Sequence, residues 1–199
     1  FLVTLAGMFL ARGLGFVLRL ESIPITHPFY GAVSNFRIAL GAFEIPATAL
    51  IFLATLAAAL YVAHWTRFGR NVYAIGGSEP SAALMGLPVG ATKIGVYALS
   101  GLCSALAGVV YTFYTSSGNP TAGTGLELDA IAAVVIGGTL LSGGVGYVAG
   151  TLVGVLIFGI IQTAITFQGT LSSWWTKIVV GLLLLAFILL QKLIQEKTK

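Results

Sequence analysis

The sequence predicts an all-α integral membrane protein, built as a bundle of several membrane-spanning helices. Only 8% of its 199 residues are charged and 57% are hydrophobic, whereas a soluble domain carries roughly 25% charged residues. No charged residue occurs from Ile94 to Leu126 or from Ala130 to Thr176. Each of these runs exceeds the ~20 apolar residues that span a bilayer, and neither shows the alternation typical of transmembrane β-strands.

Six hydrophobic segments are predicted to cross or enter the membrane. They run from Leu2 to Leu18, Pro46 to Trp65, Ile94 to Tyr114, Leu128 to Leu141, Val145 to Phe167 and Trp174 to Leu190. We expect residues 1–199 to form a single transmembrane domain. Because the chain starts with Phe1 inside an apolar segment, we also expect it to be the C-terminal part of a longer protein whose N-terminal spans are missing.

The basic residues predict the orientation of these segments. Arg67, Arg70 and Lys93 follow the second segment, and further lysines lie in the C-terminal tail. Cytoplasmic loops carry an excess of Lys and Arg, so both regions are predicted to be cytoplasmic. The stretch from Arg19 to Ile45 then lies outside, where we expect a lid-like loop.

The cytoplasmic loop, about residues 66–93, is long for a connection between two helices, where 2–8 residues are typical. Ser78 or Ser81 could cap a short helix, and Gly86 followed by Pro88 could end it. Such a helix on the cytoplasmic face would act as a lever for a soluble partner. The alternative is a solvated connector that carries only the ordinary positive charge.

The fourth segment is short and interrupted by Gly137 and Gly138, and it begins with Glu127 and Asp129. A short, irregular span is tolerated where it faces protein or a water-filled path, so we expect the translocation path here. The acids could instead complement the dipole of the helix N-terminus. Arg12, in the first segment, could extend its charge to the outer surface or pair with Glu127 or Asp129.

Small residues predict close helix packing in the fifth segment. Gly146, Gly150 and Gly154 recur every four residues, which lets helix backbones approach in a membrane. No catalytic constellation is visible, and His27, His64 and the single Cys103 do not suggest a metal site. The net charge of +4 comes from residues scattered at helix ends, so it does not indicate nucleic-acid binding.

Two long motifs carry a resemblance to a known family. Gly-Arg-Asn-Val-Tyr-Ala-Ile-Gly-Gly-Ser-Glu-Pro-Ser-Ala-Ala-Leu-Met-Gly-Leu, from Gly69, resembles the coupling loop of ribose-type sugar ABC importer permeases. The run from Pro120 to Gly146, which contains Leu-Glu-Leu-Asp-Ala-Ile-Ala-Ala-Val-Val-Ile-Gly-Gly-Thr, resembles that family's other hallmark. The ending from Gly169 to Ile178 is most similar to the galactofuranose-transporter permease.

The resemblance implies a permease subunit of the bacterial inner membrane, with a cytoplasmic C-terminus and a fold like the ten-helix vitamin B12-type importer. The six segments would be the last six of ten. The implied partners are a cytoplasmic ATP-binding subunit, a periplasmic sugar-binding protein and a second permease, either the same or a sister subunit. No phosphate-binding loop occurs in the sequence, so we expect no enzymatic activity and no cofactor in this chain, with ATP on the partner.

The expected site residues fall into two groups. Coupling to the ATP-binding subunit is expected of Arg70, Glu79, Ser81, Ala82, Ala83 and Gly86, and the translocation path is expected to include Glu127, Asp129, Gly137, Gly138 and Arg12. Alternative functions are a nucleoside or branched-chain amino-acid ABC permease, a carrier or channel outside the ABC class, and a membrane-embedded enzyme. A zwitterionic amino acid would favour charged partners, which are sparse here.

Overall fold

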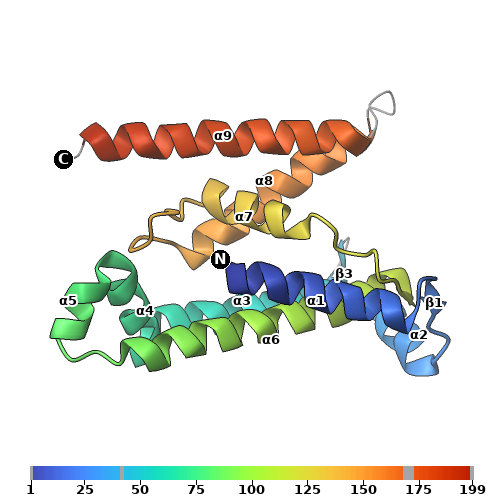
Figure 1. Ribbon diagram of the computed structural model, residues 1–199. Helices are drawn as coiled ribbons and strands as arrows, with labels where there is room; N and C mark the ends of the chain where they lie inside the picture. Colours follow the sequence, from blue (N-terminus) through green and yellow to red (C-terminus); the bar gives the residue numbers. More distant parts are fainter. Residues whose placement is uncertain (1, 41–42, 168–172, 198–199) are drawn as a thin grey trace. The chain divides into compact units, whose positions relative to one another are not determined.

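The computed structural model describes residues 2–40, 43–167 and 173–197, and these are mostly helical (Figure 1). By its contacts the chain divides into two compact units. One comprises Phe1–Thr55 and Ala98–Thr124, and the other comprises Leu56–Tyr97 and Gly125–Lys199. Helices α3 (Ala47–Trp65) and α6 (Val89–Thr115) contribute residues to both units.

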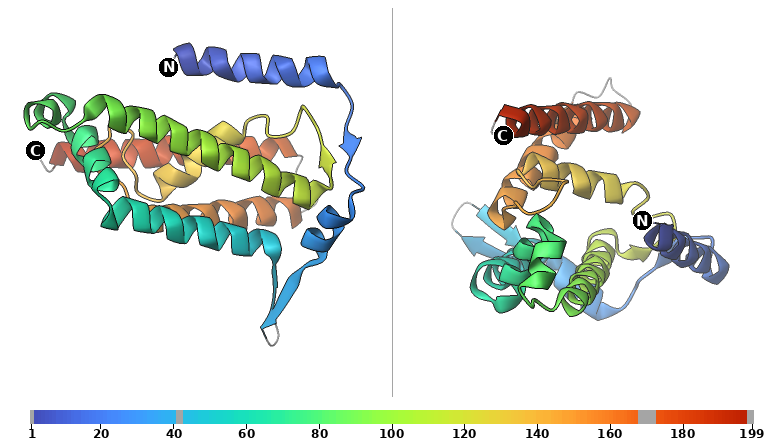
Figure 2. Two further views of the ribbon diagram at one scale, coloured as in Figure 1. Left: turned by 90° about the horizontal axis from the view of Figure 1, so that it is seen from below. Right: turned by 60° about the vertical axis from the view of Figure 1, so that its left-hand side comes forward.

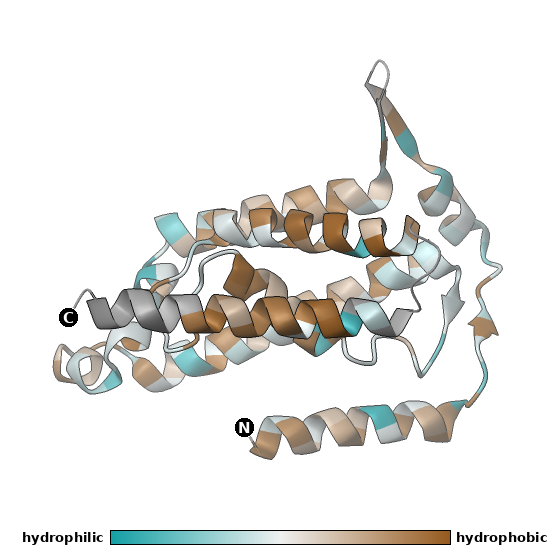
Figure 3. Cartoon of the chain, turned by 90° about the horizontal axis from the view of Figure 1, so that it is seen from above, coloured by the Kyte–Doolittle hydropathy of each residue, from teal (hydrophilic) through white to brown (hydrophobic). Residues whose placement is uncertain are grey.

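Three helices in the described part of the chain are long and apolar enough to cross a membrane: α3, α6 and α8 (Val148–Phe167). At a rise of 1.5 Å per residue, a helix as short as α3 is about 28 Å long, close to the ~30 Å hydrocarbon core of a bilayer. Figure 3 shows hydrophobic residues along these helices. Large apolar side chains such as Leu102 and Leu156 are 63% and 56% exposed. Lipid provides the apolar surroundings that such side chains need, which agrees with the predicted helical membrane protein.

The other predicted segments also form helices, and two of these differ from the predicted lengths. Helix α1 (Leu2–Leu18) matches its predicted segment, and α9 (Ser173–Lys197) is longer than predicted. Helix α7 (Leu126–Ile136) has only 11 residues and ends five residues before Leu141, the predicted end of that segment. Gly138, with φ of 89°, has a backbone conformation that an α-helix cannot continue through.

The stretch between α1 and α3, predicted to be a lid-like loop, contains several short regular elements, and its role as a lid stays a prediction. Strands β1 (Ile23–Pro24) and β4 (Ser117–Gly118) form one antiparallel pair, and β2 (Arg37–Leu40) and β3 (Phe43–Pro46) form another. The all-α prediction therefore needs these two short pairs added. The β2–β3 hairpin also carries an exposed ion pair, with Arg37 Nη1 3.0 Å from Glu44 Oε2.

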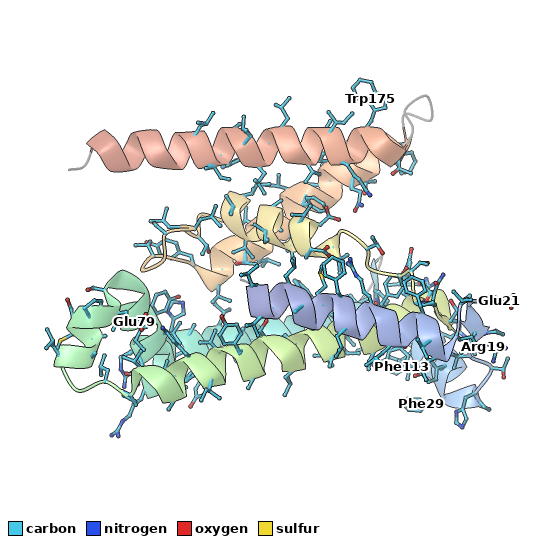
Figure 4. The ribbon with its side chains drawn as sticks, viewed as in Figure 1. Arg19, Glu21, Phe29, Glu79, Phe113 and Trp175 are labelled. Atoms are coloured by element: carbon cyan, nitrogen blue, oxygen red, sulfur yellow. The ribbon has the colours of Figure 1, made fainter. Side chains whose placement is uncertain are left out.

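Helix α2 (Pro28–Asn35) completes this first unit. The His27 Nδ1 atom accepts a hydrogen bond of 3.2 Å from the Phe29 N–H, and Pro28 occupies the first turn, where its missing N–H costs nothing. The ring of Tyr30 lies 4.9 Å from that of Phe113, and Phe29 lies beside both (Figure 4). The Ser34 hydroxyl donates to the Phe113 carbonyl oxygen. These contacts attach α2 to the end of α6.

The core of the second unit is centred on α7, which packs against α8 and α9. Ala132, Ala133 and Val135 of α7 are buried, as is Val180 of α9. Two of the three α7 residues are alanines, so the neighbouring helices come close to the α7 backbone. Close packing of this kind stabilises helix contacts in a membrane, because lipid is as apolar as a neighbouring helix and apolar burial alone gives no advantage.

Candidate functional site

The predicted cytoplasmic loop forms two helices, α4 (Arg67–Gly77) and α5 (Glu79–Leu84). Figure 2 shows them where α3 ends and α6 begins. The short helix expected between Ser78 and Gly86 is confirmed as α5. Helix α4 was missed, because the two arginines, Asn71 and three glycines of this stretch did not resemble a membrane-spanning pattern.

The corner between α3 and α4 is closed by Thr66. Its hydroxyl donates to the Val62 carbonyl at 2.6 Å and accepts from the Gly69 N–H at 3.2 Å. The first bond ends α3 and the second caps α4, so one side chain serves both helices. A Cβ on the buried Gly69 would overlap the carbonyl oxygens of Val62 and Ala63. Only glycine fits at this corner.

The first turn of α4 is also held against α6. A Cβ built on Gly95 would lie 2.7 Å from Cε2 of Phe68, so the Phe68 ring lies directly on the glycine backbone. Phe68 is the apolar residue between Arg67 and Gly69 and is partly buried, whereas Arg67 and Arg70 are exposed. Helix α4 therefore presents its charged side to solvent and its aromatic side to α6.

Ser78 separates α4 from α5 and belongs to both helix ends. Its backbone N–H donates to the Ala74 carbonyl, ending α4, and its hydroxyl accepts from the Ser81 N–H at 3.4 Å, starting α5. The hydroxyl also donates to Ser81 Oγ at 2.8 Å. Pro80 and Glu79 occupy the first turn of α5, where a proline and an acid are both favourable.

The other end of α5 is a Schellman motif. The Leu87 N–H donates to the Ala82 carbonyl at 3.1 Å and the Gly86 N–H to the Ala83 carbonyl at 3.0 Å. Gly86 has φ of 77°, the left-handed conformation that this motif requires and that glycine adopts without strain. Gly86 was predicted to end the helix, and this is confirmed.

The residues expected to couple the chain to a partner differ in accessibility. Arg70, Glu79, Ser81, Ala83 and Gly86 are exposed. Ala82 has no exposed surface, so it contributes to α5 by packing and not by direct contact with a partner. The side chains of Leu84 and Met85 are 90% and 69% exposed, and the sequence analysis did not single them out. They are large apolar residues at the end of a capped helix.

The residues expected to line a path begin at the N-terminus of α7. Glu127 is exposed and Asp129 is partly buried, both in the first turn. Gly125, the N-cap, has no side chain to cap the helix, so the two acids supply the negative charge there. Arg12 is partly buried in α1, and its pairing with either acid stays a prediction.

Beyond α7, residues 137–147 form an irregular loop whose backbone turns at three glycines. Gly138, Gly143 and Gly144 have φ of 89°, 89° and 79°. The Leu140 N–H donates to the Val145 carbonyl at 3.0 Å, and the Gly143 N–H donates to the Leu140 carbonyl at 3.1 Å, which closes a tight turn. We call residues 137–147 the α7–α8 loop.

The glycines at four-residue spacing lie where α8 meets α7 and this loop. A Cβ on Gly150 would overlap the Gly137 carbonyl oxygen, and one on Gly154 would overlap the Ala133 carbonyl oxygen. A Cβ on Gly146 would lie 3.0 Å from Cγ2 of Thr139. Backbone therefore faces backbone at Gly150 and Gly154, with no space for any side chain.

Helix α4 contacts the α7–α8 loop through its second half. The Tyr73 hydroxyl donates to the Gly146 carbonyl at 3.0 Å. A Cβ on Gly76 would lie 2.9 Å from the Gly144 nitrogen, and one on Gly143 would lie 2.8 Å from the Gly76 carbonyl oxygen. We call this contact the α4–loop junction. This contact was not predicted from the sequence, because Tyr73 and Gly146 are 73 residues apart and the only local signals are the pairs Gly76–Gly77 and Gly143–Gly144.

The described residues bring together helix ends and glycine contacts, without a cluster of metal-ligating side chains. Among the residues that the structure describes, no group of three or more His, Cys, Asp or Glu side chains could hold a metal ion. The site consists of α4, the short helix α5 and the glycine contacts between the backbones of α4 and the α7–α8 loop. At these contacts no rotatable side chain lies between the two backbones.

Comparison with known proteins adds a family match. Residues 1–188 match the family described as branched-chain amino acid transport system, permease component. The inner membrane ABC transporter permease protein YjfF of Escherichia coli is 54% identical over 193 residues, which cover 96% of this chain and 58% of that protein. No solved structure matches the chain significantly.

Two further relatives are named as sugar permeases. The fructose import permease protein FruG of Bifidobacterium longum is 40% identical over 96% of this chain and 58% of that protein. The ribose import permease protein RbsC of Bacillus subtilis is 42% identical over 96% of this chain and 59% of that protein. The chain thus spans somewhat more than half the length of these relatives.

Proposed function

Because the chain belongs to the ABC transporter permease family that includes the ribose import permeases, we propose that it is part of the membrane subunit of an ATP-driven monosaccharide importer. Relatives named for ribose and fructose import support a sugar as the substrate. In this proposal the chain forms part of the translocation path and performs no covalent chemistry. The ATP is bound by a separate subunit.

The observation that carries the proposal is helix α5 with its exposed apolar end. Leu84 and Met85 extend from a helix that is capped at both ends, and the charged side of α4 lies next to it in sequence. Unlike the exposed apolar residues of the predicted spans, these two lie on a short helix outside the spans and close in sequence to Arg67 and Arg70, both exposed, which is the combination that we expect of a docking site. A cytoplasmic ATP-binding subunit docking on α5 would move α4 and α5, and this motion would reach the membrane helices.

The path is proposed to follow α7 and the α7–α8 loop. A helix of 11 residues is only about 16 Å long and cannot cross the hydrocarbon core alone. Irregular backbone at that depth is tolerated where it lines a cavity. Gly137 and Gly138 begin this irregular part, and Glu127 and Asp129 lie at the opposite end of α7.

The remaining parts of the proposal come from the family resemblance. The six helical segments correspond to the last six helices of a ten-helix fold like that of the vitamin B12-type importer, in the bacterial inner membrane with a cytoplasmic C-terminus. A second permease subunit and a periplasmic sugar-binding protein complete the path. Galactofuranose, suggested by the ending from Gly169 to Ile178, stays a prediction. The first residues of this ending lie outside the described part of the chain.

An amino-acid substrate is the second candidate, since the family description names branched-chain amino acids. Such a substrate carries both an ammonium and a carboxylate, which favour charged partners in an apolar path. The chain offers Arg12, Glu127 and Asp129 for this purpose. A direct comparison of substrates separates the two candidates.

The test is ATP hydrolysis and uptake by vesicles that contain the full-length permease, its ATP-binding subunit and its binding protein. Ribose, fructose, galactofuranose and leucine are compared. We expect one sugar to stimulate hydrolysis and to accumulate in the vesicles. Leu84→Asp should abolish the stimulation, because it places a charge at the apolar contact, whereas the matched Leu84→Met should retain it. Stimulation by leucine alone would overturn the sugar assignment, and hydrolysis indifferent to Leu84→Asp would overturn docking on α5.

A further inference from the structure

The α4–loop junction connects the predicted docking helices to the irregular end of α7 by a route separate from α3 and α6. Helix α3 leads into α4, and α6 follows α5, so these two helices receive any motion through the chain itself. The α7–α8 loop is remote from α4 in sequence. It is nevertheless held by a hydrogen bond from Tyr73 to Gly146 and by the contacts of Gly76 with Gly143 and Gly144.

The α4–loop junction is made of backbone atoms in close contact, so α4 and the loop cannot move closer together without displacing backbone. The contacting atoms near Gly76 are backbone nitrogen, oxygen and Cα atoms, with no rotamer that could absorb a displacement. Because Gly143 and Gly144 have positive φ, the loop has a defined backbone conformation there that a change of residue would strain.

The loop is in turn fixed to α7 and α8. The Gly137 N–H donates to the Ala133 carbonyl at 3.0 Å, and the Thr139 N–H donates to the Val134 carbonyl at 3.2 Å. A Cβ on Gly137 would lie 2.5 Å from the Gly150 carbonyl oxygen. A displacement of the loop therefore reaches the C-terminal end of α7 through a few residues that are consecutive in the chain and tightly packed.

We propose that the α4–loop junction is a second output of the coupling helices, which passes the displacement of α4 to the C-terminal end of α7 and so couples ATP hydrolysis to the state of the path. This inference rests on the proposed function. It assigns a positioning role to Tyr73, Gly76 and Gly144, none of which contacts substrate in the proposal. In this proposal the junction positions the C-terminal end of α7, whereas the partner docks on α5.

Two neighbouring glycines of α4 provide a matched test. A Cβ on Gly76 would intrude on Gly144, whereas a Cβ on Gly77 meets nothing within 4 Å. Gly76→Ala and Gly77→Ala therefore make the same change in the same helix, and only the first separates α4 from the loop. Tyr73→Phe removes the hydroxyl that bonds to Gly146 without adding volume, and it is not expected to impair folding.

The measured quantity is the amount of sugar transported per ATP hydrolysed in vesicles with the full complex. We expect Gly76→Ala to lower this ratio about tenfold or more, as overpacking of a tight contact would. Tyr73→Phe should lower it about two- to tenfold, the loss of one hydrogen bond. Gly77→Ala should stay within about twofold of wild type, as for other surface changes. A folding defect would lower transport and hydrolysis together and leave the ratio unchanged.

Hydrogen–deuterium exchange in the same vesicles provides an independent readout. In the wild type, ATP binding should change the exchange of α4 and of residues 137–147 together, and Tyr73→Phe should leave the change in α4 but reduce that in the loop. Equal transport ratios for Gly76→Ala and Gly77→Ala, or loop exchange that ignores ATP, would overturn the inference. Wild-type vesicles that show no sugar-stimulated hydrolysis would instead overturn the proposed function itself.

Discussion

The ammonium nitrogen of Lys93 lies 2.6 Å from Oε1 of Glu79, which joins the first turn of α5 to the beginning of α6. The side chains of Lys93 and Glu79 are 49% and 52% exposed, so water and salt screen the pair. It orients α5 relative to α6 at a place where the intervening residues, Met85 to Pro88, form a turn. Glu79 was predicted as a coupling residue, but its pairing with Lys93 was not predicted.

The Glu79–Lys93 pair should contribute little to stability. Exposed ion pairs contribute about 0.2–1 kcal/mol, so Glu79→Gln and Lys93→Gln should each lower the thermal midpoint of the full-length protein only slightly. Their combination should cost less than the sum of the two, which a double-mutant cycle in detergent at low and high salt would measure. An interaction energy that is large and independent of salt would contradict this expectation.

Ala82 should be far less tolerant of enlargement than its neighbour Ala83. Ala82 is fully buried and Ala83 is exposed, although both lie in the same six-residue helix. Ala82→Leu should destabilise the protein by about 1–3 kcal/mol through overpacking, and Ala83→Leu should be close to neutral. Thermal unfolding of the two variants in detergent checks this, and equal midpoints would mean that α5 is not packed as described.

Gly86 should be replaceable by asparagine more easily than by alanine. The positive φ of Gly86 costs a residue with a Cβ about 1–2 kcal/mol, and asparagine tolerates that conformation better than most. Gly86→Ala should lower the thermal midpoint more than Gly86→Asn. Gly90→Ala is the control, since its Cβ meets nothing within 4 Å and its φ is not positive. A midpoint for Gly90→Ala as low as that for Gly86→Ala would contradict the strain argument.

Gly154→Ala should separate α8 from α7, whereas Gly159→Ala should not. Both glycines lie in α8, but only the Cβ at Gly154 would overlap the Ala133 carbonyl, and at Gly159 nothing lies within 4 Å. We expect a loss of about 1–3 kcal/mol for the first variant. Resistance to proteolysis within the α7–α8 loop, compared with the thermal midpoint, measures the effect. Equal behaviour of the two variants would exclude close α7–α8 packing.

The long helices were predictable because their signal is local. Leu2–Leu18 was predicted with the bounds of α1. The short helix α5 was predicted from Ser78 or Ser81 as its cap and Gly86 as its end, since capping residues act on backbone groups a few positions away. The family resemblance was predictable from two motifs, and the match over residues 1–188 confirms it.

The rest depends on contacts between distant residues. Helix α7 was predicted to run to Leu141, yet the Gly137–Gly150 approach and the positive φ at Gly138 end it at Ile136. Helix α4 contains three glycines, which weaken helical propensity, and it is held instead by Phe68 on Gly95 and by the Tyr73 hydrogen bond. Pairings of this kind follow from the tertiary arrangement, which no local pattern in the sequence describes.

Ser78 is the only residue between α4 and α5, with φ of −160° and ψ of 104°. The angle between the two helices depends on a single pair of backbone torsions, restrained by the buried Ala82 and by the Glu79–Lys93 pair. Helix α5 has six residues and is about 9 Å long, so a change of about 10° in one torsion moves its far end by about 1.6 Å. The exposed Leu84 side chain lies at that far end. A small change at Ser78 is therefore enough to change the position of Leu84, and a force applied to Leu84 acts on the Ser78 torsions through the length of α5.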